Sequence, residues 1–231
     1  MLNEIVLIIF YVIILLYSVI VHEVFHGMAA LWLGDPTAKY AGRLTFNPIK
    51  HIDPWWTVAM PVFMLILTSG RFAFGSAKPV PYNPYNLKNQ RWGPAIVAMA
   101  GPGSNLFIAV VFALAARLVA IPQAVKLDIV QNITNWAGIS ETISGSLGSI
   151  IFTLFIMVIF WNVLLAVFNL IPVPPLDGSK VFFSIFSIRP QTMAMLEQFG
   201  FLFLLVIIFV FSGPITLILN LVWGLFFSIT I

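Results

Sequence analysis

The chain opens with an apolar stretch that is too long for the helix of a small soluble domain. Residues 5–21 carry no charged side chain, and the helical pattern continues to about Leu33, where Gly34, Asp35 and Pro36 end it. About 29 residues at 1.5 Å per residue extend roughly 43 Å, which exceeds the ~30 Å hydrocarbon core of a bilayer. The stretch predicts a membrane-spanning helix. A cleaved signal peptide fits less well, because no Lys or Arg precedes the run and no small-residue cleavage site follows it.

Charged residues are scarce in the rest of the chain as well. Of the 231 residues, 61% are hydrophobic and 8% are charged, whereas a typical soluble domain is roughly 45–50% apolar and about 25% charged. This composition excludes a soluble globular enzyme, a disordered tail and a nucleic-acid-binding domain. The net charge of +3 and the pI of 9.3 do not change this conclusion, because the basic residues are scattered. The lipid bilayer is therefore a predicted partner, and nucleic acid is not.

Five further apolar segments follow along the chain. They are separated by polar or proline-rich connections and comprise residues 55–69, 93–121, 147–170, 198–212 and 215–230. The first of them has about 15 residues, where a span needs about 20, and it contains Pro61. We therefore expect it to be re-entrant, or to return through residues 70–91. The helix over 93–121 is expected to be interrupted at Gly101-Pro102-Gly103-Ser104-Asn105.

Together the segments predict an all-α polytopic membrane protein with about five to six transmembrane helices and a re-entrant or short extended segment. The extended segment is expected at Ala41–Asn47. No internal repeat or separate soluble domain is visible, so residues 1–231 are expected to form a single transmembrane domain. Its core is expected in residues 5–33, 93–121 and 147–178, with accessory helices at 198–212 and 215–230.

The sequence His22-Glu23-Val24-Phe25-His26 is the sharpest chemical signal in the chain. Residues four apart share one face of a helix, so the two imidazoles can hold one Zn²⁺ while Glu23 takes a proton from the activated water. The chain has no cysteine, so any metal must be held by His, Asp or Glu. Ionisable groups inside an apolar helix are costly and tend to be functional. A chance match on this helix is therefore the weaker interpretation.

Two histidines leave a catalytic zinc one protein ligand short. Asp177 is one candidate, because it follows the helix-breaking Pro-Val-Pro-Pro sequence at the end of the 147–170 segment. An Asp before Gly is also common in ordinary loops. His51 is the rival candidate, although its position beside Lys50 and Asp53 is more typical of an interfacial polar residue. The residues alone do not choose between these possibilities.

Three motifs in this order resemble the site-2 protease family of intramembrane zinc metalloproteases, peptidase family M50. They are HEVFHG at residues 22–27, GPGSN at 101–105 and NLIPVPPLDG at 169–178. The segments GRLTFNPIKHIDP and FGSAKPVPYNP are similar to a small prokaryotic branch of that family. No PDZ or CBS domain of the kind found in other branches fits into the chain, so the means of substrate selection is left open.

The resemblance implies transmembrane helices around one zinc per chain, inside the bilayer, and hydrolysis of peptide bonds in the transmembrane segments of partner proteins. Carried over residue by residue, His22, His26 and Asp177 resemble the zinc ligands, and Glu23 resembles the general base and acid. Asn169 resembles the residue near the metal that holds the substrate backbone or the oxyanion. Asn105 is interpreted mainly as a contact between helices. The oligomeric state is left open.

The charges predict how the chain is oriented. If His22, His26 and Asp177 bind one metal, the first span and the 147–170 span must run in the same direction. The basic residues that then fall on one side are Lys39, Arg43, Lys50, Arg71, Lys78, Lys88, Arg91, Lys180 and Arg189. The other side receives Glu4, Lys126, Asp128 and Glu141. By the positive-inside rule the first side is cytoplasmic, which predicts a prokaryotic plasma membrane protein with its active site nearer the cytoplasm.

Two other functions use the same residues. An ion transporter could conduct through the His/Glu/Asp cluster, since intramembrane charge and broken helices suit transporters as well. Clustering at one depth argues against this function, because a conduction path needs polar groups across the membrane. An inactive homologue could bind transmembrane segments without cleaving them. The intact set of predicted ligands and base argues against loss of activity.

Overall fold

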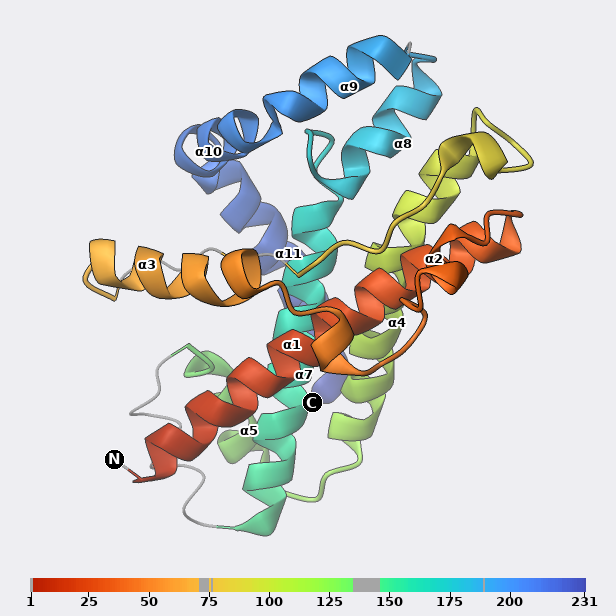
Figure 1. Cartoon of the computed structure of the whole chain (residues 1–231). Coiled ribbons are helices and arrows are strands. Elements are labelled where there is room, and N and C mark those ends of the chain that lie inside the picture. The colour runs from red at the N-terminus through yellow and green to blue at the C-terminus, as the bar shows by residue number, and fades with distance from the viewer. Residues whose placement is uncertain (1, 71–74, 76, 135–145, 189) are drawn as a thin grey trace.

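The computed structural model describes residues 2–70, 75, 77–134, 146–188 and 190–231, and within them every regular element is a helix (Figure 1). Four helices are long and apolar enough to cross a membrane. They are α1 (Leu2–Trp32), α4 (Gly93–Arg117), α7 (Leu147–Asn169) and α11 (Ser212–Thr230). This confirms the predicted all-α polytopic class. The orientation charges Arg71, Glu141 and Arg189 lie outside the described residues.

The remaining helices are short. The expected segment 55–69 forms a π-helical turn η2 (Pro54–Ala59) that continues into α3 (Met60–Leu67), which together are too short for a span. Likewise 198–212 forms only α10 (Gly200–Val210). These two short segments account for the difference between the four long helices and the expected five to six. The other short helices are α2 (Thr37–Tyr40), η1 (Pro48–Lys50), η3 (Pro84–Asn86), α5 (Gln123–Gln131), α8 (Asp177–Ile185) and α9 (Pro190–Gln198).

The long helices form a bundle with α4 at its centre. In Figure 1, α1 and α7 run up the page, while α4 and α11 run down it. Helix α4 packs against α1, α7, α8 and α11. Its buried face is built largely from small residues, which allow close approach of neighbouring helices: Gly101, Ser104, Asn105, Ala109, Ala113 and Ala116. The larger side chains of the core, such as Phe152, Ile156 and Met157, come from α7.

Helix α4 is continuous through Pro102, so the interruption expected at 101–105 is wrong. Proline removes one backbone donor and crowds the preceding turn. Here the neighbours of the proline are Gly101 and Gly103, which carry no side chain. The Ser104 Oγ hydroxyl also donates to the Gly101 carbonyl, 2.7 Å away, within the same turn.

The strand expected at 41–47 is also wrong, because these residues form turns and bends. Gly42 has a φ of +63°, in the left-handed region that an extended strand does not use. The Arg43 side chain is buried and donates to the backbone carbonyls of Lys50 and Lys78. Residues 41–47 bend because Gly42 turns the backbone and the Arg43 guanidinium is held by these two carbonyls.

Asp35 connects the polar loop after α1 to the polar loop before α4, as Arg43 does at another point. Its carboxylate is buried and accepts hydrogen bonds from the Thr37 backbone and hydroxyl, the Asn83 backbone N–H and the Asn86 side chain. Burial by itself would raise the pKa of Asp35, but these donors stabilise the charged form and hold its pKa below the ordinary value. With Arg43, it fixes residues 77–83 against the C-terminal half of α1.

Lys126 closes the opposite end of the bundle. Its Nζ lies 3.4 Å, 3.2 Å and 3.3 Å from the carbonyl oxygens of Ala116, Arg117 and Thr230, at the C-terminal ends of α4 and α11. The side chain is buried, with Nζ over the Phe152 ring. The Ala116 carbonyl also accepts from the Val119 N–H. The Lys126 cation therefore serves mainly the carbonyls of Arg117 and Thr230, which lie at helix ends.

We expect Lys126→Met to lower the free energy of unfolding in detergent by about 2–4 kcal/mol, because the variant leaves buried acceptors without a donor. Thermal or denaturant unfolding followed by circular dichroism measures the change. Lys39→Met is the matched control, since Lys39 is exposed on α2. Equal unfolding of the two variants would contradict the capping role of Lys126.

Candidate metal centre

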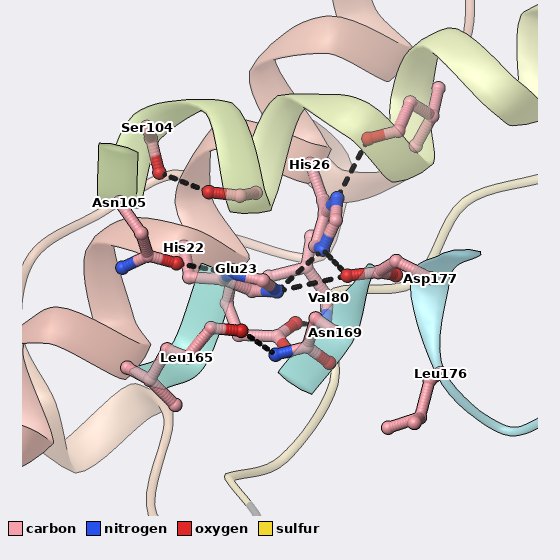
Figure 2. Close-up of polar contacts among 12 residues, drawn as sticks. His22, Glu23, His26, Val80, Ser104, Asn105, Leu165, Asn169, Leu176 and Asp177 are labelled. Atoms are coloured by element: carbon pink, nitrogen blue, oxygen red, sulfur yellow. Dashed lines mark hydrogen bonds and ion pairs between the residues drawn. The ribbon is translucent and has the colours of Figure 1, made fainter. Parts of the chain in front are cut away.

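Two histidines of α1 and one aspartate of α8 meet in the interior of the bundle (Figure 2). His22 and His26 lie one helical turn apart, and their Nε2 atoms are 2.9 Å from each other. The Asp177 Oδ2 atom lies 3.1 Å from each of these two nitrogens. The three predicted ligands are therefore brought together, although Asp177 is 155 positions away from His22 in the sequence.

Asp177 is the first residue of α8, and the preceding turns aim its side chain at α1. The start of α8 packs directly on the end of α7, at Leu170 and Ile171. A Cβ atom on Gly178 would lie 2.3 Å from the Leu170 carbonyl oxygen and 2.6 Å from that of Ile171. A glycine after Asp177 is therefore needed for the carboxylate to come this close to the histidines.

The other ring nitrogen of each histidine is held by α4. His22 Nδ1 lies 2.6 Å from Asn105 Oδ1, and His26 Nδ1 lies 2.7 Å from the Val97 carbonyl oxygen. A carbonyl oxygen only accepts, so each Nδ1 carries the hydrogen and donates. In the neutral rings, both Nε2 atoms then present lone pairs to the Asp177 carboxylate.

This arrangement fits a bound cation. Three acceptor atoms face one another within 3.1 Å, which is unfavourable unless a positive charge lies among them. The separations are close to the roughly 3.3 Å between the ligand atoms of a tetrahedral zinc, whose bonds to nitrogen and oxygen are about 2.0–2.1 Å. Two imidazoles and one carboxylate are also a donor set that catalytic zinc sites use.

The rival ligand His51 lies elsewhere. It is fully buried in the polar loop, where its Nε2 is 2.8 Å from the Thr45 carbonyl oxygen, and it does not belong to the His22–His26–Asp177 group. The position at the membrane interface that the sequence favours for His51 stays a prediction. Next to His51, Arg43 donates to the Lys50 carbonyl and the Lys78 N–H donates to the His51 carbonyl.

Gly101 of α4 lies directly against the two histidine rings. A Cβ atom added there would be 2.5 Å from both Cε1 and Nε2 of His26 and 2.7 Å from Cε1 of His22. Real Cβ contacts are never this short, so the bare backbone of Gly101 forms one wall of the site. The GPGSN motif therefore contributes both a wall, through Gly101, and a hydrogen-bond acceptor, through Asn105.

Glu23 is held by the extended 77–83 segment. Its Oε2 atom accepts a hydrogen bond of 2.8 Å from the Val80 backbone N–H (Figure 2). Arg43 fixes the same segment through the carbonyls of Lys78 and Pro79. The segment thus orients one carboxylate oxygen of Glu23 beside the two histidines.

Asn169 is the last residue of α7, and its side chain turns back along the helix. Its Nδ2 atom donates to the Leu165 carbonyl oxygen, 2.9 Å away. Within the described residues, no hydrogen bond connects Asn169 to His22, His26 or Asp177. Its assignment as a residue that contacts substrate stays a prediction.

Sequence reasoning missed three partners of the site. The Val97 carbonyl and the Val80 N–H are backbone atoms, and no sequence pattern identifies them. Asn162, whose Oδ1 accepts from Asn105 Nδ2, is different. It is a polar residue inside the apolar stretch 147–170, and intramembrane polar groups tend to be functional. Asn105 was interpreted mainly as a contact between helices, and the structure shows that it also binds His22.

Comparisons with known proteins show which family the chain resembles. The model of Peptidase family M50 matches residues 10–212. A Bacillus subtilis (strain 168) protein named "Putative zinc metalloprotease YwhC" is 34% identical over 198 residues, which cover 85% of this chain and 78% of that protein. The "Putative zinc metalloprotease Rip2" of Mycolicibacterium smegmatis is 29% identical over 84% of this chain and 64% of its own length. No solved structure matches the chain.

Proposed function

This chain belongs to peptidase family M50, and we propose on that basis that it is a zinc-dependent endopeptidase that cuts peptide bonds within or near transmembrane segments of other proteins. The observation that carries the proposal is the convergence of His22, His26 and Asp177 within 3.1 Å on otherwise apolar helices. We propose these three residues as the zinc ligands. The whole chain, residues 1–231, then serves as one transmembrane metalloprotease domain.

The position of the site supports an intramembrane substrate. His22 lies 17 residues after Ile5, the first residue of the apolar α1 span, which is about 26 Å along the helix axis. This supports a site near the C-terminal boundary of the span, with His22 still within the ~30 Å hydrocarbon thickness when that thickness begins at Ile5. We therefore expect the scissile peptide bond to come from a segment that itself enters the bilayer.

The residues around the site divide the chemistry among them. A bound zinc supplies a Lewis acid that makes a water molecule more acidic and polarises the scissile carbonyl. Glu23 accepts the proton of the attacking water and returns it to the leaving amine. Asn105 and the Val97 carbonyl keep the two histidines oriented. We propose that Asn169 donates to the substrate backbone or to the oxyanion, which requires its amide to leave the Leu165 carbonyl.

A reconstituted cleavage assay tests this function. The purified chain in liposomes is incubated with a single-span substrate, and the products are mapped by mass spectrometry. We expect a cut inside or next to the apolar segment, loss of cleavage with a zinc chelator, and recovery when zinc is added back. Cleavage that persists after complete removal of metal would contradict the proposal.

We further propose that the site faces the cytoplasmic half of a prokaryotic plasma membrane. The described basic residues Lys39, Lys50, Lys78 and Lys88 lie in the two loops next to the C-terminal half of α1, and cytoplasmic loops are enriched in Lys and Arg. The chain has no cysteine, so single cysteines at the exposed positions Ile49 and Tyr85 report topology directly. We expect both to be labelled only from the cytoplasmic side. Labelling of the two positions from opposite sides would refute this orientation.

A further inference from the structure

A chain of buried polar side chains connects His22 to helix α7. Asn105 on α4 and Asn162 on α7 are 0% and 1% exposed, and Asn105 Nδ2 donates to Asn162 Oδ1 across 2.7 Å. The same Nδ2 lies 3.3 Å from the Ser18 carbonyl oxygen of α1. Asn162 Nδ2 donates to the Ser18 hydroxyl, 2.9 Å away, and to the Val158 carbonyl, 2.8 Å away. Three helices are thus joined by side-chain amides beside the metal centre.

The backbone carbonyls at the end of this chain set its direction. The Val158 and Ser18 carbonyls can only accept, so the atoms of Asn162 and Asn105 that face them must be the amide nitrogens. Asn162 therefore turns its oxygen to Asn105, and Asn105 turns its oxygen to His22. A rotated amide at either residue would place two oxygens against each other in a buried site, which costs free energy.

We propose that Asn162 is a positioning residue of the metal centre, acting on His22 through Asn105. By receiving one hydrogen of the Asn105 amide, it keeps the Asn105 oxygen pointed at His22 Nδ1. His22 then keeps its hydrogen on Nδ1 and presents the Nε2 lone pair to His26 and Asp177. The inference rests on the proposed zinc site and adds to it a residue that touches neither metal ligand nor substrate.

Partners that orient a metal-binding histidine contribute strongly to metal affinity, typically about 10–100-fold. In Asn162→Leu, the Asn105 amide retains only the longer contact to the Ser18 carbonyl, and both Asn105 and the His22 ring gain freedom to rotate. We therefore expect zinc to leave Asn162→Leu faster than wild type, with little change in the shape of the bundle. The zinc dissociation rate reports this effect without any need for substrate.

The experiment measures zinc transfer from the purified, zinc-loaded full chain to a chromogenic chelator in detergent. We expect about 10–100-fold faster transfer from Asn162→Leu. Thr153→Val is the matched control, because Thr153 is also fully buried on α7 and loses only a hydrogen bond to the Ser149 carbonyl. Transfer from Asn162→Leu at the rate of the control would overturn the inference. If Asn162→Leu does not fold, the same transfer rate is measured for Asn162→Ser. Its shorter side chain also withdraws the oxygen from Asn105, so we expect faster zinc transfer from this variant as well.

A double variant separates positioning from packing. In an Asn105→Leu background the link to His22 is already broken, so adding Asn162→Leu should change the dissociation rate no further. If the fold-changes in the zinc dissociation rate of the two single variants multiply in the double variant, Asn162 acts independently of Asn105. That result would overturn the inference. A wild-type chain that binds no zinc would refute the proposed function itself, whereas wild-type zinc binding with no effect of Asn162→Leu refutes only the positioning role.

Discussion

The Glu23→Gln variant is expected to retain zinc as well as the wild type does and to cleave a transmembrane substrate about 10²–10⁴-fold more slowly, the usual contribution of a general base. Glutamine has the same shape as glutamate, and its oxygen can still accept the Val80 N–H that holds Glu23 in place. Neither the 77–83 segment nor the two histidines should therefore move. What the variant lacks is a group that takes up a proton.

Two measurements on the same preparation decide the role of Glu23: kcat on the reconstituted substrate and zinc content by atomic emission. The exposed Glu197 of α9 gives the matched control, and Glu197→Gln should cleave at the wild-type rate. A Glu23→Gln protein that holds zinc and still cleaves at full rate would show that another group accepts the proton. Loss of zinc from this variant would show that Glu23 supports the metal rather than the proton transfer.

The Gly101→Ala variant is expected to lose zinc binding and, with it, at least about 10²-fold of activity, the loss expected when catalytic groups are displaced by about 1 Å. The new methyl group would overlap the His26 ring at 2.5 Å and the His22 ring at 2.7 Å. The rings cannot easily retreat, because Asn105 and Val97 of the same helix hold them against α4. Either the histidines or the whole of α4 must shift.

Gly103→Ala is an unusually close control for this substitution. It makes the same change two residues further along α4, where an added Cβ has no neighbouring atom within 4 Å. Alanine favours a helix over glycine by about 1 kcal/mol, so this variant should be slightly more stable and should keep zinc and activity. Equal zinc content in Gly101→Ala and Gly103→Ala would contradict the wall that Gly101 is argued to form.

The parts of the fold that could be predicted are those that depend on neighbouring residues. The apolar runs of α1, α4 and α7 are long enough to dictate spanning helices by themselves, and the spacing of His22 and His26 places them on one helical face. The third proposed ligand could not be derived in this way. Asp177 reaches the histidines only because α7 runs alongside α1 in the same direction and Gly178 allows α8 to start against the end of α7. The residues alone therefore left Asp177 as one of two candidates, and the family resemblance favoured it over His51.

The errors arose where distant contacts override local preference. A strand was expected at 41–47 from a short pattern of residues, but the buried Arg43 side chain and the left-handed Gly42 bend that segment into turns. The GPGSN motif was expected to break α4, yet the helix is continuous through Pro102, where it packs against α1 and α8. Asn105 was assigned chiefly to helix packing, because nothing in the sequence places it one hydrogen bond from His22.

The central claim, that His22, His26 and Asp177 together hold a catalytic zinc, is tested most directly by the zinc content of the purified chain. We expect about one zinc per wild-type chain and almost none in His22→Ala, His26→Ala or Asp177→Ala, each measured after brief dialysis against a weak chelator. Circular dichroism should show the same helix content in all four proteins. A wild-type chain without zinc, or folded variants that keep as much zinc as the wild type, would contradict the claim.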